Sequence, residues 1–419
     1  MKSLRKFMDR IKPAFYGGKL SSLRSVYDGF DTFLFTPRDT SGPVGVQVHD
    51  SMDSKRTMTI VIVALMPCFF FGMYNTAYQH WLAAGAIEFP FWEMMLYGLL
   101  AILPMVLTTY IVGLGIEFIC AQLRHEEIQE GFLVTGIILP MILPIETPLW
   151  MVAVATAFAV IFAKEVFGGT GYNIVNVALT ARAFLFFAYP AKMSGDHVFV
   201  ATQPILGVGP TVPDGFTCAT PLGQIATAQG GDVALTGVGD HAITAADAFW
   251  GFIPGSFGET STFCILIGAA ILLLTRIADW RIIVSVVAGA LCMGWIANVF
   301  ETPTYPGSYL NPADQLLFGG LAFAAVFMAT DPVTAARTRT GKWIYGFLIG
   351  IIAVLIRVYN TGYPEGAMLA VLLMNVFAPL IDWCVVQANV RRRERRLVAA
   401  ENALDATEDK IEAEEGRAS

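Results

Sequence analysis

The sequence predicts an all-α polytopic membrane protein with about ten transmembrane helices, arranged as two inverted five-helix repeats. Hydrophobic residues make up 55% of its 419 residues and charged residues only 15%, whereas a soluble protein carries about 25% charge. Apolar runs of membrane-spanning length recur along the chain, and the basic residues collect between alternate runs. This composition excludes a soluble enzyme.

Ten apolar segments are candidates for membrane helices, because a helix needs about 20 apolar residues to cross a bilayer. The third contains Pro140 and Pro144, so we expect it to be kinked or to span only partly. Residues 1–55 are mixed and charged, so the first apolar run is expected to be a retained helix rather than a cleaved signal. The segments are 57–78, 94–120, 131–145, 148–164, 174–190, 262–276, 282–300, 314–330, 342–358 and 366–388.

The basic residues predict the orientation. With residue 1 in the cytoplasm and ten helices, all but three of the 27 Lys and Arg residues fall on the cytoplasmic side, the exceptions being Arg182, Lys192 and Arg357. Both termini are therefore expected in the cytoplasm. The predicted parts are a cytoplasmic arm (1–56), a first five-helix half (57–190), an outer, periplasmic loop (191–260), a second five-helix half (261–390) and a cytoplasmic tail (391–419).

A weak internal similarity supports the inverted repeats. The run from Phe162 to Gly171 ends the fourth predicted helix, and the run from Phe327 to Val333 ends the eighth. Five helices in each half give the two halves opposite topology. Many transporters are built this way, with sites between the repeats.

The cysteines indicate neither a disulfide nor a metal site. Five of the six lie in apolar runs, where cysteine acts as a small hydrophobic residue, and only Cys218 lies in the outer loop. There is no CxxC motif or Cys/His cluster, so we expect no metal site that this chain forms alone.

The outer loop contains a turn of small residues that ends in Thr217-Cys218-Ala219-Thr220, after Asp214. Taken alone, Thr220 is most simply an ordinary loop threonine. The stretch resembles the site at which flavin mononucleotide (FMN) is attached through its phosphate to a threonine, in the B-type subunit of the sodium-translocating NADH:quinone oxidoreductase and in its relative, the D-type subunit of the Rnf complex. The family pattern ends in Ser/Thr-Gly-Ala-Thr, with Cys218 here replacing the glycine. The resemblance implies covalent FMN on Thr220.

A second stretch, residues 164–190, resembles the family's Lys-Glu-Val-Phe-Gly-Gly-Thr-Gly segment and the Asn-x-x-Asn-Pro helix that follows it. Val177 stands where the family has proline. Asn173 and Asn176 are three residues apart, so on a helix they would share a face. The resemblance implies an unmodified riboflavin near these two amides. The alternative is a tight interhelical turn with an Asn cap.

Charges inside apolar runs form a third group. Arg182 lies in mid-helix and should pair with an acid, for which Glu117 and Asp382 are the matching candidates. The resemblance implies that Glu117 and Asp382 support sodium passage; the alternative is a structural ion pair. Glu365 and Asp331 stand at helix ends, where each could be a cap or an interfacial charge.

The run from Ile111 to Glu117 resembles the family segment linked to quinone. The resemblance implies a quinone site at Gly113 and Leu114, with the arm before residue 55 as a partial cover. The alternative is close helix packing at Gly113 and Gly115, which is common in membranes.

The resemblance covers nearly the whole chain. It implies a bacterial inner-membrane subunit of a translocase that passes electrons from NADH through covalent FMN and riboflavin to ubiquinone or menaquinone and exports sodium. Its implied partners are five other subunits, quinone, sodium ion, a flavin transferase and membrane lipid, and no nucleic acid. Thr220 would be an attachment point, and no catalytic residue is expected.

Residues 168–171 lack the Gly-x-Gly-x-x-Gly spacing and a preceding strand, so no NADH site is expected there. The resemblance implies that NADH is oxidised on another subunit. Two alternatives remain. One is an Rnf-type electron-transport subunit, which would use ferredoxin instead of quinone. The other is a flavin-free channel or transporter built on inverted repeats.

Overall fold

The computed structural model describes residues 2–16, 27, 31, 54–124, 131–193, 199–213, 215–228, 234–239, 241–360 and 362–418. Most of the predicted cytoplasmic arm, with its expected cover over the quinone site, lies outside these residues, and so does Asp214. The described residues form helices, with two isolated β-bridges and no extended strand among them. The prediction of an all-α fold is confirmed.

Within the described ranges, six helices are long and apolar enough to cross a membrane. The chain is therefore a multi-pass membrane protein, as predicted. These helices are α3 (Ser54–Ala83), α4 (Phe91–Arg124), α6 (Leu149–Ala159) with its extensions η2 (Val160–Lys164) and η3 (Glu165–Phe167), α12 (Trp280–Val299), α15 (Arg339–Tyr359) and α16 (Ala367–Ala418).

The other four predicted segments are helical but short or broken. Three are single short helices: α5 (Phe132–Ile142), α7 (Val177–Ala188) and α11 (Thr262–Leu274). The fourth consists of α13 (Asp314–Leu317), α14 (Leu321–Phe323) and the π-helix η5 (Ala324–Met328). At 1.5 Å per residue a 12-residue helix is about 18 Å long, well short of a hydrocarbon core of about 30 Å. The predicted segments are longer than these helices because a hydropathy pattern also includes the apolar turns that flank each helix.

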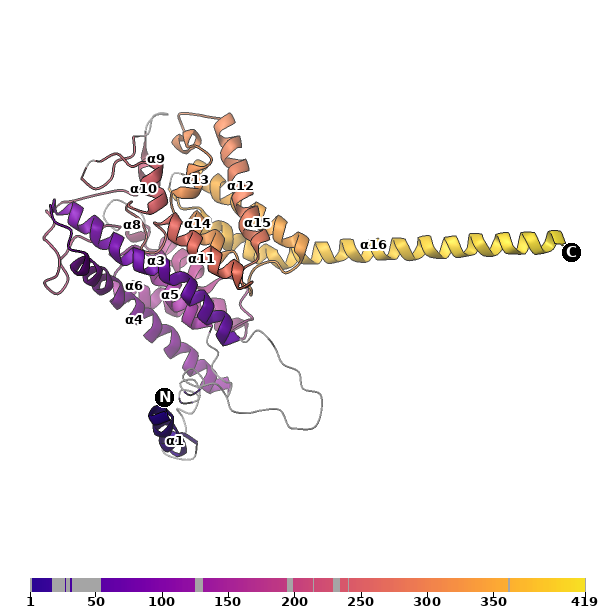
Figure 1. The fold of residues 1–419 in the computed structure, drawn as a ribbon, viewed down its shortest axis with the longest axis horizontal. Coiled ribbons are helices and arrows are strands. Elements are labelled where there is room, and N and C mark those ends of the chain that lie inside the picture. The colour runs from indigo at the N-terminus through magenta and orange to yellow at the C-terminus, as the bar shows by residue number, and fades with distance from the viewer. Residues whose placement is uncertain are drawn as a thin grey trace.

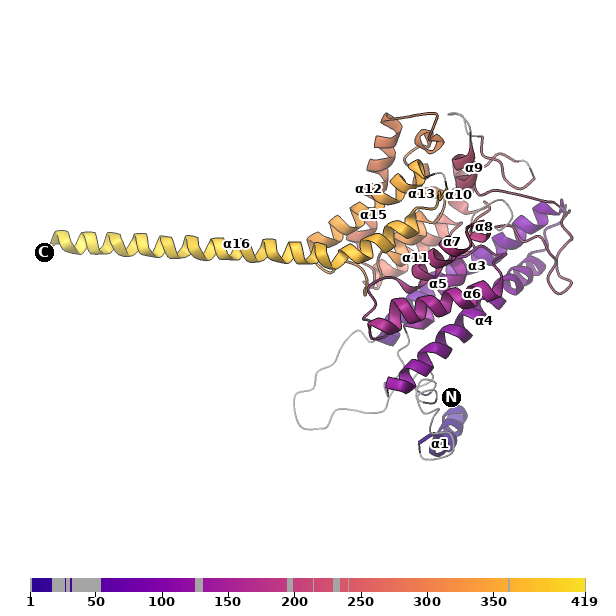
Figure 2. The ribbon, with the colours of Figure 1, turned by 180° about the vertical axis from the view of Figure 1, so that it is seen from behind.

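The short helices α11 and α14 lie between α3 on one side and α12 and α15 on the other (Figures 1 and 2). α3 packs against α4 and α11, α12 packs against α15, and α15 packs against α16. α16 projects far from the body, and α9 (Pro221–Thr227) and α10 (Ala245–Trp250) lie at the end opposite α1 (Lys2–Tyr16), as both views show (Figures 1 and 2). The remaining short helices are α8 (Pro190–Met193) and η4 (Pro306–Tyr309).

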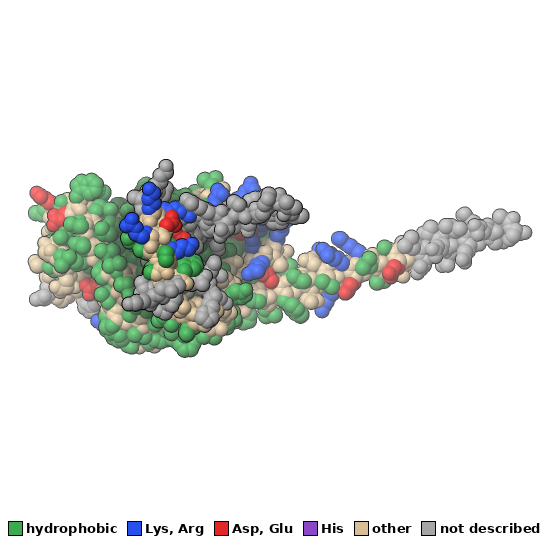
Figure 3. Space-filling view, turned by 90° about the horizontal axis from the view of Figure 1, so that it is seen from below, with side chains coloured by type: hydrophobic (Ala, Val, Ile, Leu, Met, Phe, Trp, Pro, Cys, Tyr) green, Lys and Arg blue, Asp and Glu red, His purple; other side chains and the backbone are tan. Residues whose placement is uncertain are grey.

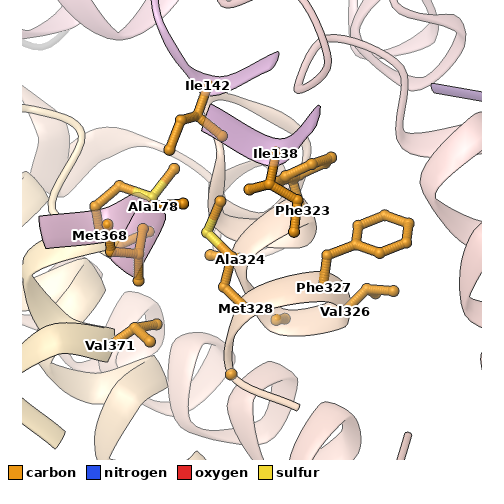
Figure 4. Packing of buried hydrophobic residues seen from close by; sticks show 14 of the residues in the cluster. Ile138, Ile142, Ala178, Phe323, Ala324, Val326, Phe327, Met328, Met368 and Val371 are labelled. Atoms are coloured by element: carbon orange, nitrogen blue, oxygen red, sulfur yellow. The ribbon is translucent and has the colours of Figure 1, made fainter. Parts of the chain in front are cut away.

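The two predicted halves meet in one apolar core. Figure 4 shows Ile138 and Ile142 of α5 and Ala178 of α7 close to Phe323, Met328 and Met368 of α14, η5 and α16. These side chains are almost completely buried. Helices of the first half thus pack directly against broken helices of the second, and the site described below lies in this region.

The outer surface of the body is apolar. Figure 3 shows hydrophobic side chains over much of the visible face, with Lys and Arg gathered over α1 and along the near part of α16. Large apolar side chains such as Ile111, Leu123 and Phe187 are more than two-thirds exposed. A surface of this kind suits contact with lipid or with other membrane subunits.

The fourth and eighth predicted segments, whose ends the sequence showed to be similar, also share a type of helix that the sequence did not predict. Each contains a π-helix, η2 in one and η5 in the other. η2 continues into the 3-10 helix η3 before the turn at Gly168, and η5 is followed directly by a turn. π-Helices are rare and occur frequently at functional sites. The inverted two-fold relation of the halves itself stays a prediction.

Candidate functional site

A cavity with about 820 Å³ of space between atoms, including its open mouth, lies where the two halves meet. Its walls come from the starts of α3 and α5, the turn before α7, and the end of η5. Ile138 and Phe327 are among its apolar residues, and Thr135, Asn173 and Asn176 are among its polar ones. Pockets that bind small molecules typically combine apolar walls with a few convergent polar groups.

Asn173 and Asn176 both line this cavity, but they do not share a helix face. α7 begins at Val177, and Asn176 is its N-cap, with the side-chain oxygen accepting the N–H of Leu179 at 3.2 Å. The helix-face prediction is therefore wrong, and the alternative of an Asn cap is confirmed for Asn176. The glycines at 168, 169 and 171 have positive φ, so this segment forms a turn instead of continuing a helix.

The two amides also hold the wall of the cavity. Asn176 Nδ2 donates to Asp331 Oδ2 at 3.3 Å, which links the first half to the second. Asn173 Nδ2 donates to the carbonyl of Val175 at 3.1 Å. Asp331 also accepts the N–H of Val333 and the hydroxyl of Thr334. The proposed riboflavin contact of Asn173 and Asn176 stays a prediction.

Glu117 and Lys164 form a buried ion pair beside this cavity. Lys164 Nζ donates to Glu117 Oε1, and Lys164 and Glu117 are 4% and 5% exposed. Burying a charge is costly unless it is paired, and the pair supplies that compensation. A second ion pair, Arg124 Nη1 to Glu165 Oε2 at 3.0 Å, lies nearby, between the end of α4 and the start of η3. Glu117 is thus a structural ion-pair partner, while its role in sodium passage stays a prediction.

The notch at Gly113 is filled by an aromatic ring. Gly113 is buried on α4, and a Cβ built there would overlap the ring of Phe132 from α5. Leu114 packs against the main core, and a Cβ on Gly115 would meet no described atom within 4 Å. The packing alternative therefore describes Gly113 but not Gly115. The quinone assignment of Gly113 and Leu114 stays a prediction.

Arg182 is fully buried in α7, where the end of α5 meets the loops that precede α11 and α16. Its guanidinium donates to Glu259 Oε1 at 3.2 Å, to Glu365 and to the carbonyl of Ile142, the last residue of α5. A carbonyl at a helix end has no intrahelical donor, so Arg182 satisfies it. The expectation that Glu117 or Asp382 matches Arg182 is wrong, because the loops after α10 and before α16 bring in closer carboxylates.

Glu259 lies in the loop between α10 and α11, outside the apolar helices. Burial raises the pKa of its carboxyl, and the charge of Arg182 opposes that rise. Arg182, Glu259 and Glu365 together form what is called here the Arg182 cluster. Its two carboxylates and one guanidinium give it a net negative charge when all three groups are ionised.

Asp382 of α16 holds the turn before α15. Its carboxylate accepts the N–H groups of Arg337 and Thr338 at 2.7 and 3.0 Å and the Thr338 hydroxyl at 2.5 Å. Thr338 in turn caps α15 through the N–H of Gly341. These are structural contacts, and the sodium role of Asp382 stays a prediction.

Thr220 is the N-cap of α9. Its Oγ accepts the N–H of Gly223 at 3.2 Å, and Pro221 is the first helical residue. Thr220 is 9% exposed, whereas Thr217 is exposed at the surface of the loop. Thr220 lines a cavity with about 330 Å³ of space between atoms, together with Glu259 and Glu365. The predicted attachment residue therefore lies next to the Arg182 cluster, which the sequence did not reveal.

The donor sets fit the groups that the resemblance implies. The cavity at Asn173 and Asn176 offers amides, hydroxyls, one ammonium and one carboxylate between apolar walls, which suits a flat heteroaromatic ring with one polar edge. Thr220 offers a hydroxyl flanked by the small Ala219 and Gly223. Among the described residues, no three His, Cys, Asp or Glu side chains are grouped so that they could hold a metal ion.

Sequence reasoning missed Lys164 and Glu259. Lys164 stands at the end of an apolar run, where a lysine side chain usually reaches the membrane interface, so its position did not indicate the burial that the structure shows. Glu259 lies in a Gly- and Ser-containing loop with no long apolar run on its N-terminal side. Only the fold shows that this loop enters the body.

Comparison with known proteins gives a consistent result. The model of the NQR2, RnfD, RnfE family matches residues 43–391. The B-type subunit of the Na(+)-translocating NADH-quinone reductase from Pseudomonas aeruginosa (strain LESB58) is 43% identical over 416 residues, which cover 94% of this chain and 99% of that protein. The proteins of the same name from Ectopseudomonas mendocina (strain ymp) and Klebsiella pneumoniae (strain 342) are 43% and 42% identical, with coverage of 94% of this chain and 100% and 99% of theirs. The chain belongs to the NQR2, RnfD, RnfE family.

Proposed function

We propose that this chain is the B-type membrane subunit of a sodium-translocating NADH–quinone reductase. The observation that carries this proposal is the end-to-end identity of 42–43% with proteins of that name. The six apolar helices and the apolar outer surface agree with a membrane-embedded role within a multi-subunit complex. The membrane is the bacterial inner membrane, with both termini in the cytoplasm.

Two flavins, FMN bound covalently to Thr220 and riboflavin held in the cavity at Asn173 and Asn176, would supply the electron transfer. Thr220 Oγ is the attachment atom. The α9 cap and the Gln224 side chain, which donates to the carbonyl of Ala219 at 3.0 Å, hold the Thr220 loop in place. The apolar walls at Ile138 and Phe327 would exclude water from the faces of a bound ring.

The remaining proposals concern cargo and substrate. Quinone binds near Gly113 and Leu114 once the Phe132 ring moves aside. Sodium passes near Glu117 and Asp382, whose carboxylates suit a hard cation. NADH is oxidised on another subunit. The partners are five further subunits, and a flavin transferase modifies Thr220.

The test uses the whole complex purified from membranes. We expect sodium-stimulated quinone reduction by NADH, and a peptide containing Thr220 whose mass is raised by one FMN less water. Electron exchange with ferredoxin in place of quinone would favour the Rnf-type alternative. A complex without any flavin would contradict the proposal and favour a channel or transporter.

A further inference from the structure

Lys164 lies between the cavity at Asn173 and Asn176 and the carboxylate of Glu117. It lines the cavity, and its Nζ is paired with Glu117 on the other side. Its Nζ also lies 5.9 Å from the centroid of the Phe132 ring. Lys164 and Asp331 are the charged residues among the described lining of the cavity.

We propose that Lys164 is the positioning residue that sets the reduction potential of the flavin in this cavity, and that it shares its ammonium between that flavin and Glu117. The inference rests on the proposed function, because it assumes that riboflavin occupies the cavity. Lys164 transfers no atom; it acts only through its charge and its N–H donors.

The chemistry of an ammonium allows this sharing. Lysine has three N–H donors on a flexible stem, so one can serve Glu117 while another points to a ligand. A flavin that has gained electrons is more negative than the oxidised ring unless an equal number of protons follows. A buried cation nearby therefore favours the reduced ring, and low local dielectric makes the effect large.

The neighbouring charges do not offer the same arrangement. Arg124 pairs with Glu165 close by but is not among the residues that line the cavity. Asp331 lines the cavity, but its negative charge would oppose reduction of the ring. Lys164 therefore combines a positive charge, a place on the cavity wall and direct contact with Glu117.

The experiment is a redox titration of the non-covalent flavin in the purified complex, with riboflavin content measured by acid extraction. We expect Lys164→Gln to shift the equilibrium toward the oxidised flavin by about tenfold, ~59 mV for a one-electron couple. Lys164→Arg, which keeps the charge, should restore most of the potential. A purely structural role would not produce this dependence on charge.

Glu117→Gln supplies the opposite test. It leaves Lys164 without its anionic partner, so the potential of the flavin should rise. The double variant Arg124→Gln/Glu165→Gln removes the neighbouring ion pair without leaving a free charge, so it is the matched control and should leave the potential unchanged. If Lys164→Gln fails to assemble, Glu117→Gln still decides the question, because only the inference expects it to raise the potential.

Two negative results have different meanings. A wild-type complex without non-covalent flavin would overturn the proposed function and this inference with it. A bound flavin whose potential and content ignore both Lys164→Gln and Glu117→Gln would overturn only the inference, and Lys164 would then be a structural partner of Glu117.

Discussion

At the scale of single residues, two buried cations, Arg182 and Lys164, are paired with carboxylates remote in the sequence. Arg182 reaches Glu365, 183 positions away, and Lys164 reaches Glu117, 47 positions away. An unpaired charge in an apolar interior is so costly that such partners act as constraints on how the helices can be arranged.

Removing Arg182 should therefore destabilise the protein strongly. Arg182→Gln leaves Glu259 and Glu365 close together without their guanidinium, at a cost of about 3–5 kcal/mol. Thermal unfolding of the purified complex and the yield of assembled complex measure this cost. Lys192→Gln, at an exposed residue, is the control and should change little. Equal stability of the two variants would show that the buried cluster contributes little to the fold.

Thr220 offers a prediction at the level of one oxygen atom. Thr220→Ala removes the hydroxyl that would carry FMN, so the covalent flavin fluorescence of this subunit in a denaturing gel should disappear. Thr217→Ala changes the more accessible neighbouring threonine and should keep the signal. Fluorescence that survives Thr220→Ala but is lost in Thr217→Ala would move the attachment to Thr217.

Gly113 can be tested as a packing residue and as a quinone residue in one experiment. A Cβ at Gly113 would overlap Phe132, so Gly113→Ala should cost about 1–3 kcal/mol by overpacking. Adding Phe132→Ala removes the clash, and the two costs should not add. A double variant that assembles well but reduces quinone poorly would support the quinone assignment; additive costs would contradict the packing contact.

At the scale of elements, the short helices are informative because their ends lie inside the body. The carbonyl of Ile142 accepts from Arg182, and the carbonyl of Met141 accepts the N–H of Gly258 at 2.8 Å. In an apolar environment each free backbone group costs several kcal/mol, so broken helices persist only where side chains or loops satisfy them. The loop carrying Glu259 therefore completes α5.

Variants of Asp382 can distinguish its structural role in the turn before α15 from a role in sodium passage. Asp382→Ala removes three hydrogen bonds to Arg337 and Thr338 and should lower stability by about 1–3 kcal/mol. Asp382→Asn keeps acceptor capacity while removing the charge, so it should assemble better. If Asp382 supports sodium passage, Asp382→Asn should raise the sodium concentration for half-maximal quinone reduction. An unchanged sodium dependence in well-assembled Asp382→Asn would limit Asp382 to holding the turn.

At the scale of the whole molecule, the two halves are joined by intimate contacts. α3 of the first half packs against α11 of the second, and α7 packs against α16. The cavity, the Arg182 cluster and the Asn176–Asp331 contact all draw residues from both halves. Relative movement of the halves would therefore alter all three together.

The orientation of the molecule can be tested by cysteine labelling in intact cells. The distribution of Lys and Arg predicts that α9 faces the periplasm and the projecting part of α16 the cytoplasm. Thr227→Cys, on the exposed end of α9, should react with a membrane-impermeant maleimide, whereas Glu401→Cys should react only after permeabilisation. A parent with its native cysteines replaced is the background. The reverse labelling pattern would invert the topology.

The sequence by itself determined the fold class, the positions of the ten helical segments and the resemblance that the family comparison confirms. Hydropathy and short motifs are local properties, so they can be read without knowing what a segment contacts. Tertiary structure alone decided that Arg182 pairs with Glu259 and Glu365, that Phe132 fills the notch at Gly113, and that six of the described helices reach full spanning length while the others are short or broken. Those outcomes depend on which broken helices meet in space, and burial forces charges and backbone groups to find partners that sequence proximity does not indicate.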